Sequence, residues 1–233
     1  MISMNNIFKR YHFITNFPKG YPFHKRFIDN LFFFFTGIII HPRKNQLTHA
    51  DLLRATLKLK KGDIILVGNL RTVFHLLVTE PVTHSAFYVG HRKFIHSIAD
   101  GVQYISLFKV FQDYDTLAIL RLPKNTKDKK SIIKRAVAFA TSQYGKPYDF
   151  EFRKGIQAFF CTELVNEAFI AAGYDTQLSS VRRPKTVMRK IEDYVSGSVD
   201  ALHPINFLES KFVVVYLSHN LKYKKGILSY LKN

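Results

Sequence analysis

The residue with the clearest capacity for chemistry is Cys161, which is the only cysteine among the 233 residues. Apolar residues follow it at helical spacing from Leu164 to Phe169, so we predict that a helix begins at or just before Cys161. Unpaired N–H groups and the positive end of the dipole at a helix start favour a thiolate, and they can also hold an oxyanion formed on a carbonyl substrate. The position indicates a thiol nucleophile, and the alternative is a small buried apolar residue.

Two histidines are candidates for the base that such a nucleophile needs and for the group that orients the base. His84 and His96 lie in segments 83–89 and 93–98, which we predict to be neighbouring antiparallel strands. With a three-residue loop at 90–92 both even-numbered histidines share one sheet face, about 7 Å apart at the backbone, whereas a two-residue loop would separate them. We expect His84 to point at the start of the Cys161 helix, within about 4 Å of the thiol. Alternatively, each histidine is an ordinary polar residue of a sheet.

Tyr148 is a candidate for an orienting or oxyanion-binding group, because its phenol precedes Cys161 by thirteen residues and follows a Gly-Lys-Pro turn. The alternative is a tyrosine that only packs. Cys161, His84 and His96 could also form a zinc site, but the chain lacks the paired ligand spacing typical of such sites. We therefore expect no metal and no cofactor, and no glycine-rich phosphate loop is present.

The elements that must position these residues follow an α+β pattern. Strands are predicted at 64–67, 102–110, 116–122 and 211–217, and helices at 46–59, 131–144 and 183–195, with one or two helical turns at 73–78. Consecutive strands without regular alternation favour an antiparallel sheet with helices on one side.

Composition and charge limit the classes of function. The 47% apolar content supports a folded core, and a single cysteine excludes an internal disulfide. The net charge of +18 attracts polyanions, but no nucleic-acid module is recognisable, so we expect nucleic acid not to be a partner. The plain interpretation of the charge is a basic, soluble surface.

The N-terminal residues differ from the rest of the chain. We divide it into a basic, Phe/Ile-rich extension (1–45), a main domain (46–220) and a basic tail (221–233). The apolar run from Leu31 to Ile40 is shorter than the roughly 20 residues that span a bilayer, and no cleavage site follows it. We expect residues 27–40 to contact a membrane surface and the protein to be cytoplasmic or peripherally membrane-bound, whereas the sequence does not indicate its oligomeric state.

Several segments together resemble a known enzyme family. The segments Lys146-Pro-Tyr-Asp149 and Phe160-Cys-Thr-Glu-Leu-Val165 resemble the nucleophile region of the permuted papain-like amidases of the YaeF/YiiX type. These enzymes belong to the NlpC superfamily, with the lecithin retinol acyltransferase-like proteins as relatives. Gly62-Asp-Ile-Ile-Leu66 resembles their first core strand, and Thr83-His-Ser-Ala-Phe-Tyr-Val-Gly90 their histidine strand, in the permuted order of histidine before cysteine.

This resemblance, over about residues 47–220, implies a circularly permuted papain-like fold whose antiparallel sheet packs against helices, including the nucleophile helix. It implies that Cys161 is the nucleophile, that His84 is the base and that Tyr148 matches the tyrosine preceding the nucleophile. His96 falls where YaeF/YiiX members often carry glutamate and is more similar to the acyltransferase relatives.

The expected function is a cysteine-dependent hydrolase or acyltransferase that cleaves an amide or ester of a peptide or lipid through a thioester acyl-enzyme, with His96 orienting His84. The alternative is an inactive papain-like shell that binds anionic membrane or nucleic acid through its basic surface.

Overall fold

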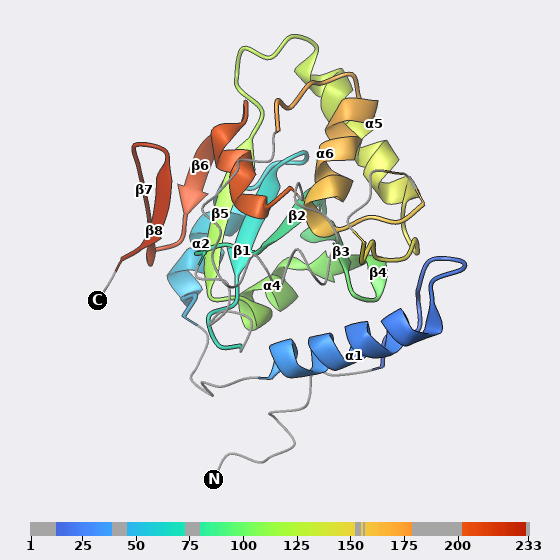
Figure 1. The fold of residues 1–233 in the computed structure, drawn as a ribbon. Coiled ribbons are helices and arrows are strands. Elements are labelled where there is room, and N and C mark those ends of the chain that lie inside the picture. The colour runs from blue at the N-terminus through green and yellow to red at the C-terminus, as the bar shows by residue number, and fades with distance from the viewer. Residues whose placement is uncertain are drawn as a thin grey trace.

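The computed structural model describes residues 13–38, 46–72, 80–151, 155, 157–178 and 202–231. A six-stranded antiparallel sheet forms its centre, and helices cover both faces (Figure 1). The elements predicted at 73–78 and 183–195 lie outside the described residues.

The central sheet has the strand order β4-β3-β2-β1-β5-β6, and each neighbouring pair is antiparallel. β1 in the middle is buried along its whole length, which explains why its sequence is a continuous apolar run. The strands are β1 Ile64–Gly68, β2 His84–Gly90, β3 Lys93–Ile98, β4 Gly101–Ser106, β5 Thr116–Arg121 and β6 Val213–Leu217.

The hairpin between β2 and β3 has the predicted register but not the predicted loop. Phe87 pairs with Ile95, as a three-residue loop would require. The loop nevertheless has two residues, His91 and Arg92, both in the left-handed region with φ of 53° and 57°. A bulge between Tyr88 and Gly90 adds the missing residue and restores the parity that a two-residue loop alone would reverse.

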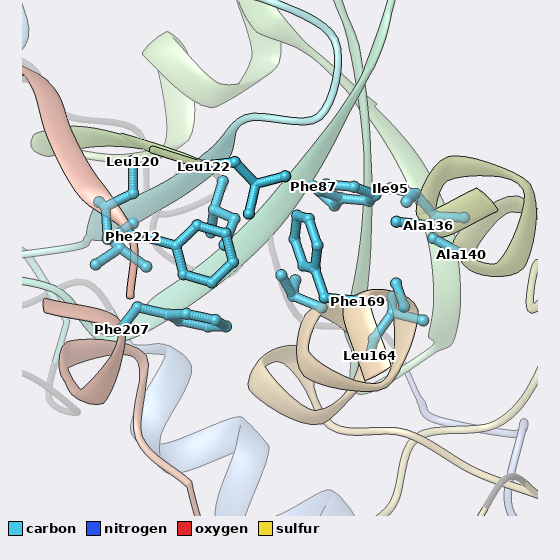
Figure 2. Packing of buried hydrophobic residues seen from close by; sticks show 14 of the residues in the cluster. Phe87, Ile95, Leu120, Leu122, Ala136, Ala140, Leu164, Phe169, Phe207 and Phe212 are labelled. Atoms are coloured by element: carbon cyan, nitrogen blue, oxygen red, sulfur yellow. The ribbon is translucent and has the colours of Figure 1, made fainter. Parts of the chain in front are cut away.

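One face of the sheet is covered by α5 (Lys129–Ser142) and α6 (Cys161–Ala171). Figure 2 shows Phe87 of β2 against Phe169 of α6, with ring centroids 5.2 Å apart. The 3₁₀ helix η2 (Pro204–Glu209) adds Phe207 to the same core. The predicted tail forms a hairpin, β7 (Leu221–Lys224) and β8 (Ile227–Tyr230), and Leu221 and Leu228 join this core; the domain boundary at 221 stays a prediction.

The other face is covered by α2 (His49–Lys58) and α4 (Leu107–Asp113), so the prediction of helices on one side only was wrong. The predicted strand 102–110 ends at Ser106, whose hydroxyl accepts a hydrogen bond from Lys109 N at 3.1 Å and caps α4. The apolar side chains of Leu107 and Val110 lie three residues apart and face the sheet from this helix.

The N-terminal segment packs at one end of the molecule, where α1 (Phe23–Gly37) lies apart from the helices that cover the sheet (Figure 1). Ile14, Tyr21 and Phe33 form a small third cluster with Phe150 and Tyr148. The described part of the chain has no helix that is both long and apolar enough to cross a membrane.

Candidate active site

Cys161 is the first residue of α6, as predicted. The preceding segment is fixed on two sides: Phe159 N donates to Pro147 O at 3.2 Å, and Ser97 Oγ of β3 donates to Phe159 O at 2.5 Å. The chain therefore has an extended conformation just before the helix. The turn into α6 places the Cys161 thiol at the helix start, and Cys161 is 9% exposed. The thiol lies 3.8 Å from Thr162 Oγ1.

His84 and His96 form a hydrogen-bonded pair, with 2.9 Å between His84 Nε2 and His96 Nδ1. The prediction that they share a sheet face is confirmed. His96 is fully enclosed at 3% exposure, and the His84 ring stacks parallel to Tyr114 with centroids 5.8 Å apart.

Burial keeps both imidazoles neutral at physiological pH. It lowers the pKa of His84 to about 4. Burial and then the charge of His84 lower the pKa of His96 well below its ordinary value. In a neutral pair one nitrogen donates and the other accepts, so each ring fixes the tautomer of its partner.

The prediction was that His84 would point at the start of α6, within about 4 Å of the Cys161 thiol. Within the described residues, no hydrogen bond joins the thiol to either imidazole. His84 pairs with Val67 and shares its sheet face, whereas α6 packs on the opposite face, at Phe87. Pairing between β2 and β3 begins only at Phe87, so β2 is not paired with β3 at His84. This unpaired part lies at the end of the sheet where α6 starts, because Ser97 of β3 is hydrogen-bonded there to Phe159.

Backbone hydrogen bonds join Pro147 and Asp149 to Phe159, which brings Tyr148 close to the start of α6. Its expected role toward the thiol or the oxyanion stays a prediction. Burial raises the pKa of Tyr148 well above its ordinary value, and the charges of Cys161, Asp149 and Glu163 add to this effect. The phenol therefore stays protonated and can donate a hydrogen bond. Its ring packs edge-on against Phe33 of α1, with centroids 6.4 Å apart.

Sequence reasoning missed a pair of buried carboxyl groups next to the nucleophile. Glu163 in the first turn of α6 is 5% exposed, and Asp149 is 7% exposed. Burial and the charge of Asp149 raise the pKa of Glu163 to about 8. The available signal was their position, since Asp149 directly follows Tyr148 and Glu163 lies two residues after Cys161.

Metal ligands do not converge in the described ranges: no three His, Cys, Asp or Glu side chains there could hold an ion together. Cys161, His84 and His96 are all among the described residues, and they are not grouped as such a set.

Comparison with known proteins gives a family and a fold. The model of the permuted papain-like amidase enzymes of the YaeF/YiiX type matches residues 58–210. The crystal structure of the metalloprotein YiiX from Escherichia coli O157:H7 has a TM-score of 0.50 and 14% sequence identity, and the match covers 68% of this chain and 97% of YiiX. No curated protein matches the chain.

Proposed function

Because the chain belongs to the permuted papain-like amidase family of YaeF and YiiX, we propose that it is a thiol hydrolase in which Cys161 attacks the carbonyl carbon of an amide. The observation that carries this assignment is the neutral, hydrogen-bonded pair of His84, on the strand that resembles the family's histidine strand, and His96 on the neighbouring strand β3. A buried pair of this kind supplies a base with a fixed tautomer.

The hydrogen bond between the histidines determines which nitrogen can act. His84 Nε2 is occupied by His96, so His84 Nδ1 is the nitrogen left for the thiol. For Nδ1 to accept a proton, His84 must carry its own proton on Nε2 and donate it to His96 Nδ1. His96 is then a positioning residue, because it holds His84 in the tautomer that can act as a base.

In the proposed reaction, His84 Nδ1 removes the Cys161 proton while sulfur attacks the carbonyl carbon. The resulting oxyanion receives hydrogen bonds from backbone N–H groups at the start of α6 and from Tyr148. His84 returns the proton to the leaving amine, and a thioester remains on Cys161. Water then attacks the thioester with His84 again acting as base, which releases the acid and the free thiol. An alcohol or amine in place of water would give acyl transfer.

The reaction requires the thiol and His84 to meet at the end of the sheet, where β2 and β3 are not paired with each other. We propose that substrate binding brings them together there, since catalytic hydrogen bonds often tighten only in the substrate complex.

The test is covalent labelling by acyl electrophiles of peptide and lipid type, followed by intact mass. We expect one adduct on wild type, none on Cys161→Ala, and slow labelling of His84→Ala. Release of the adduct by hydroxylamine identifies a thioester, and added amine distinguishes transfer from hydrolysis. A wild-type protein that accepts none of these electrophiles would refute the enzyme assignment.

A second candidate is an inactive shell that binds anionic partners, and the missing hydrogen bond between Cys161 and His84 favours it. In that case salt-dependent binding to anionic partners would persist unchanged in Cys161→Ala.

A further inference from the structure

Helix α1 exposes its apolar residues to solvent. Phe23, Phe27, Leu31 and Phe35 recur every four residues along one stripe and are 84%, 62%, 45% and 53% exposed. Ile28 beside them is 52% exposed. A helix that serves only the protein core turns such a stripe inward. We name these five side chains the outer stripe.

The fully buried residues of α1 are polar, which is the reverse of the usual arrangement, and Phe33 packs beside them against the third cluster. These buried residues are Asp29, Asn30 and Thr36. Asn30 Oδ1 accepts a hydrogen bond from Ile14 N at 2.7 Å, and Asn30 Nδ2 donates to Ile14 O at 3.3 Å. Tyr21 donates its hydroxyl hydrogen to Asp29 at 2.8 Å. Rotating the helix to bury the stripe would leave these groups without partners, so the outward orientation is specified by the fold.

The surroundings of the outer stripe are basic. Lys19 and His24 are exposed just before the helix and in its first turn. Lys25 pairs with Glu151, and Arg26 donates to Tyr21 O at 3.0 Å, which anchors the first turn. The whole chain has a net charge of +18. An apolar surface of this size needs a partner, and the charge indicates an anionic one.

We infer that the outer stripe of α1 docks the protein on the surface of a bilayer that contains anionic lipid. The helix has 15 residues, which is too short to cross the bilayer but suits a helix lying in the interface plane. Phenylalanine and leucine side chains enter the acyl boundary, while the basic residues remain with the lipid headgroups. A second copy of this chain fits less well, because it carries the same positive charge.

The position of α1 relative to the site gives the docking a consequence that rests on the proposed function. Phe33 on the inner side of α1 contacts Tyr148, and the residues on either side of Tyr148 are hydrogen-bonded to Phe159, two residues before Cys161. Docking therefore places Cys161 close to the lipid surface. The substrates that Cys161 would reach are molecules embedded in that surface.

The first experiment is co-sedimentation with vesicles of phosphatidylcholine containing phosphatidylglycerol. We expect wild type to bind, binding to weaken with salt, and a variant with Phe27→Ser, Leu31→Ser and Phe35→Ser to bind at least about tenfold more weakly. The control carries Leu57→Ser and Ile227→Ser, which are 84% and 68% exposed on α2 and β8, and it should bind like wild type. Equal loss in both variants, or no wild-type binding, would overturn the proposal.

A second measurement uses the absence of tryptophan from the chain. Phe27→Trp should show a blue-shifted emission with anionic vesicles, whereas Leu57→Trp should not. Light scattering in the absence of vesicles tests whether a second copy of the chain covers the outer stripe instead. The proposal would be contradicted if wild type were a dimer that the triple-serine variant breaks and if vesicles caused no emission shift in Phe27→Trp. Neither measurement depends on Cys161, so docking and catalysis can fail independently.

Discussion

His84 Nε2 and His96 Nδ1 lie 2.9 Å apart on one face of the central sheet, and burial keeps both rings neutral. The first consequence concerns His96, whose proposed role is to accept the His84 Nε2–H hydrogen. His96→Ala should lower kcat/KM by about 10- to 1000-fold, since a misoriented base loses much of the contribution of general-base catalysis. His96→Asn, with an amide oxygen that can accept the same hydrogen, should recover a large part of the activity. The exposed loop residue His91 provides the control, because His91→Ala should leave activity unchanged. If the Asn and Ala variants were equally impaired, the orienting role of His96 would be excluded.

The low pKa of His84 determines the acid side of the pH profile. A base is active when it is unprotonated, and burial lowers the pKa of His84 to about 4. We expect kcat/KM to persist well below pH 6.5 and to fall only as the histidine pair takes up a proton, with a midpoint that belongs to the pair. A pH series of kcat/KM in wild type measures this, and a midpoint at or above 6.5 would show that the pair is solvated rather than buried.

Glu163 should make the protein less stable as the pH rises. Its pKa is raised from 4.5 to about 8 in the folded chain, so between these values the unfolded chain releases a proton that the folded chain retains. The contribution of Glu163 to the free energy of unfolding is therefore highest below pH 4.5. It decreases between pH 4.5 and about pH 8 and stays constant at higher pH.

Glu163→Gln removes this ionisation and should raise Tm at pH 7.5 by roughly 2–8 °C, with little difference from wild type near pH 4.5. Thermal melts of both proteins across this range measure the effect. Glu209→Gln, at an exposed site, should follow wild type throughout. A difference in Tm that is the same at every pH would mean that packing, rather than ionisation, explains the result.

Tyr148→Phe removes the phenol hydroxyl and keeps the ring, so it tests the roles of the two groups separately. The ring contacts with Phe33 and Phe150 remain possible in the variant, so Tm should change by no more than a few degrees. If the hydroxyl donates to the oxyanion, kcat should fall by about 10- to 1000-fold with KM little changed. Unchanged kcat would leave Tyr148 with a packing role only.

The central strands and the nucleophile helix were predictable from the sequence because their hydrophobic patterns are local. Alternation in 83–89 and 93–98 predicted the register that pairs Phe87 with Ile95 and hence the shared face of the histidines. The loop itself was not predictable, because His91 and Arg92 adopt left-handed backbone angles that favour glycine or asparagine. α4 was missed although Ser106 gives an N-cap signal, since its apolar residues also fit a strand.

Features that depend on tertiary contacts could not be predicted from local sequence patterns. The polar inner face of α1 exists because Asn30 and Asp29 find partners at Ile14 and Tyr21. The proximity of Glu163 to Asp149 depends on the return of the chain beside α6. The parity argument placed the histidines together, but it could not say on which face of the sheet α6 would pack.

The central claim is that His84 activates Cys161 as a nucleophile. The most direct test is the second-order rate constant for alkylation by iodoacetamide at pH 7, followed by intact mass, because the single cysteine makes every adduct a report on Cys161. His91→Ala serves as the control. The proposal predicts that alkylation is at least about tenfold slower in His84→Ala than in wild type and in the control. Equal rate constants in all three proteins would contradict it, since Cys161 would then react without the help of His84.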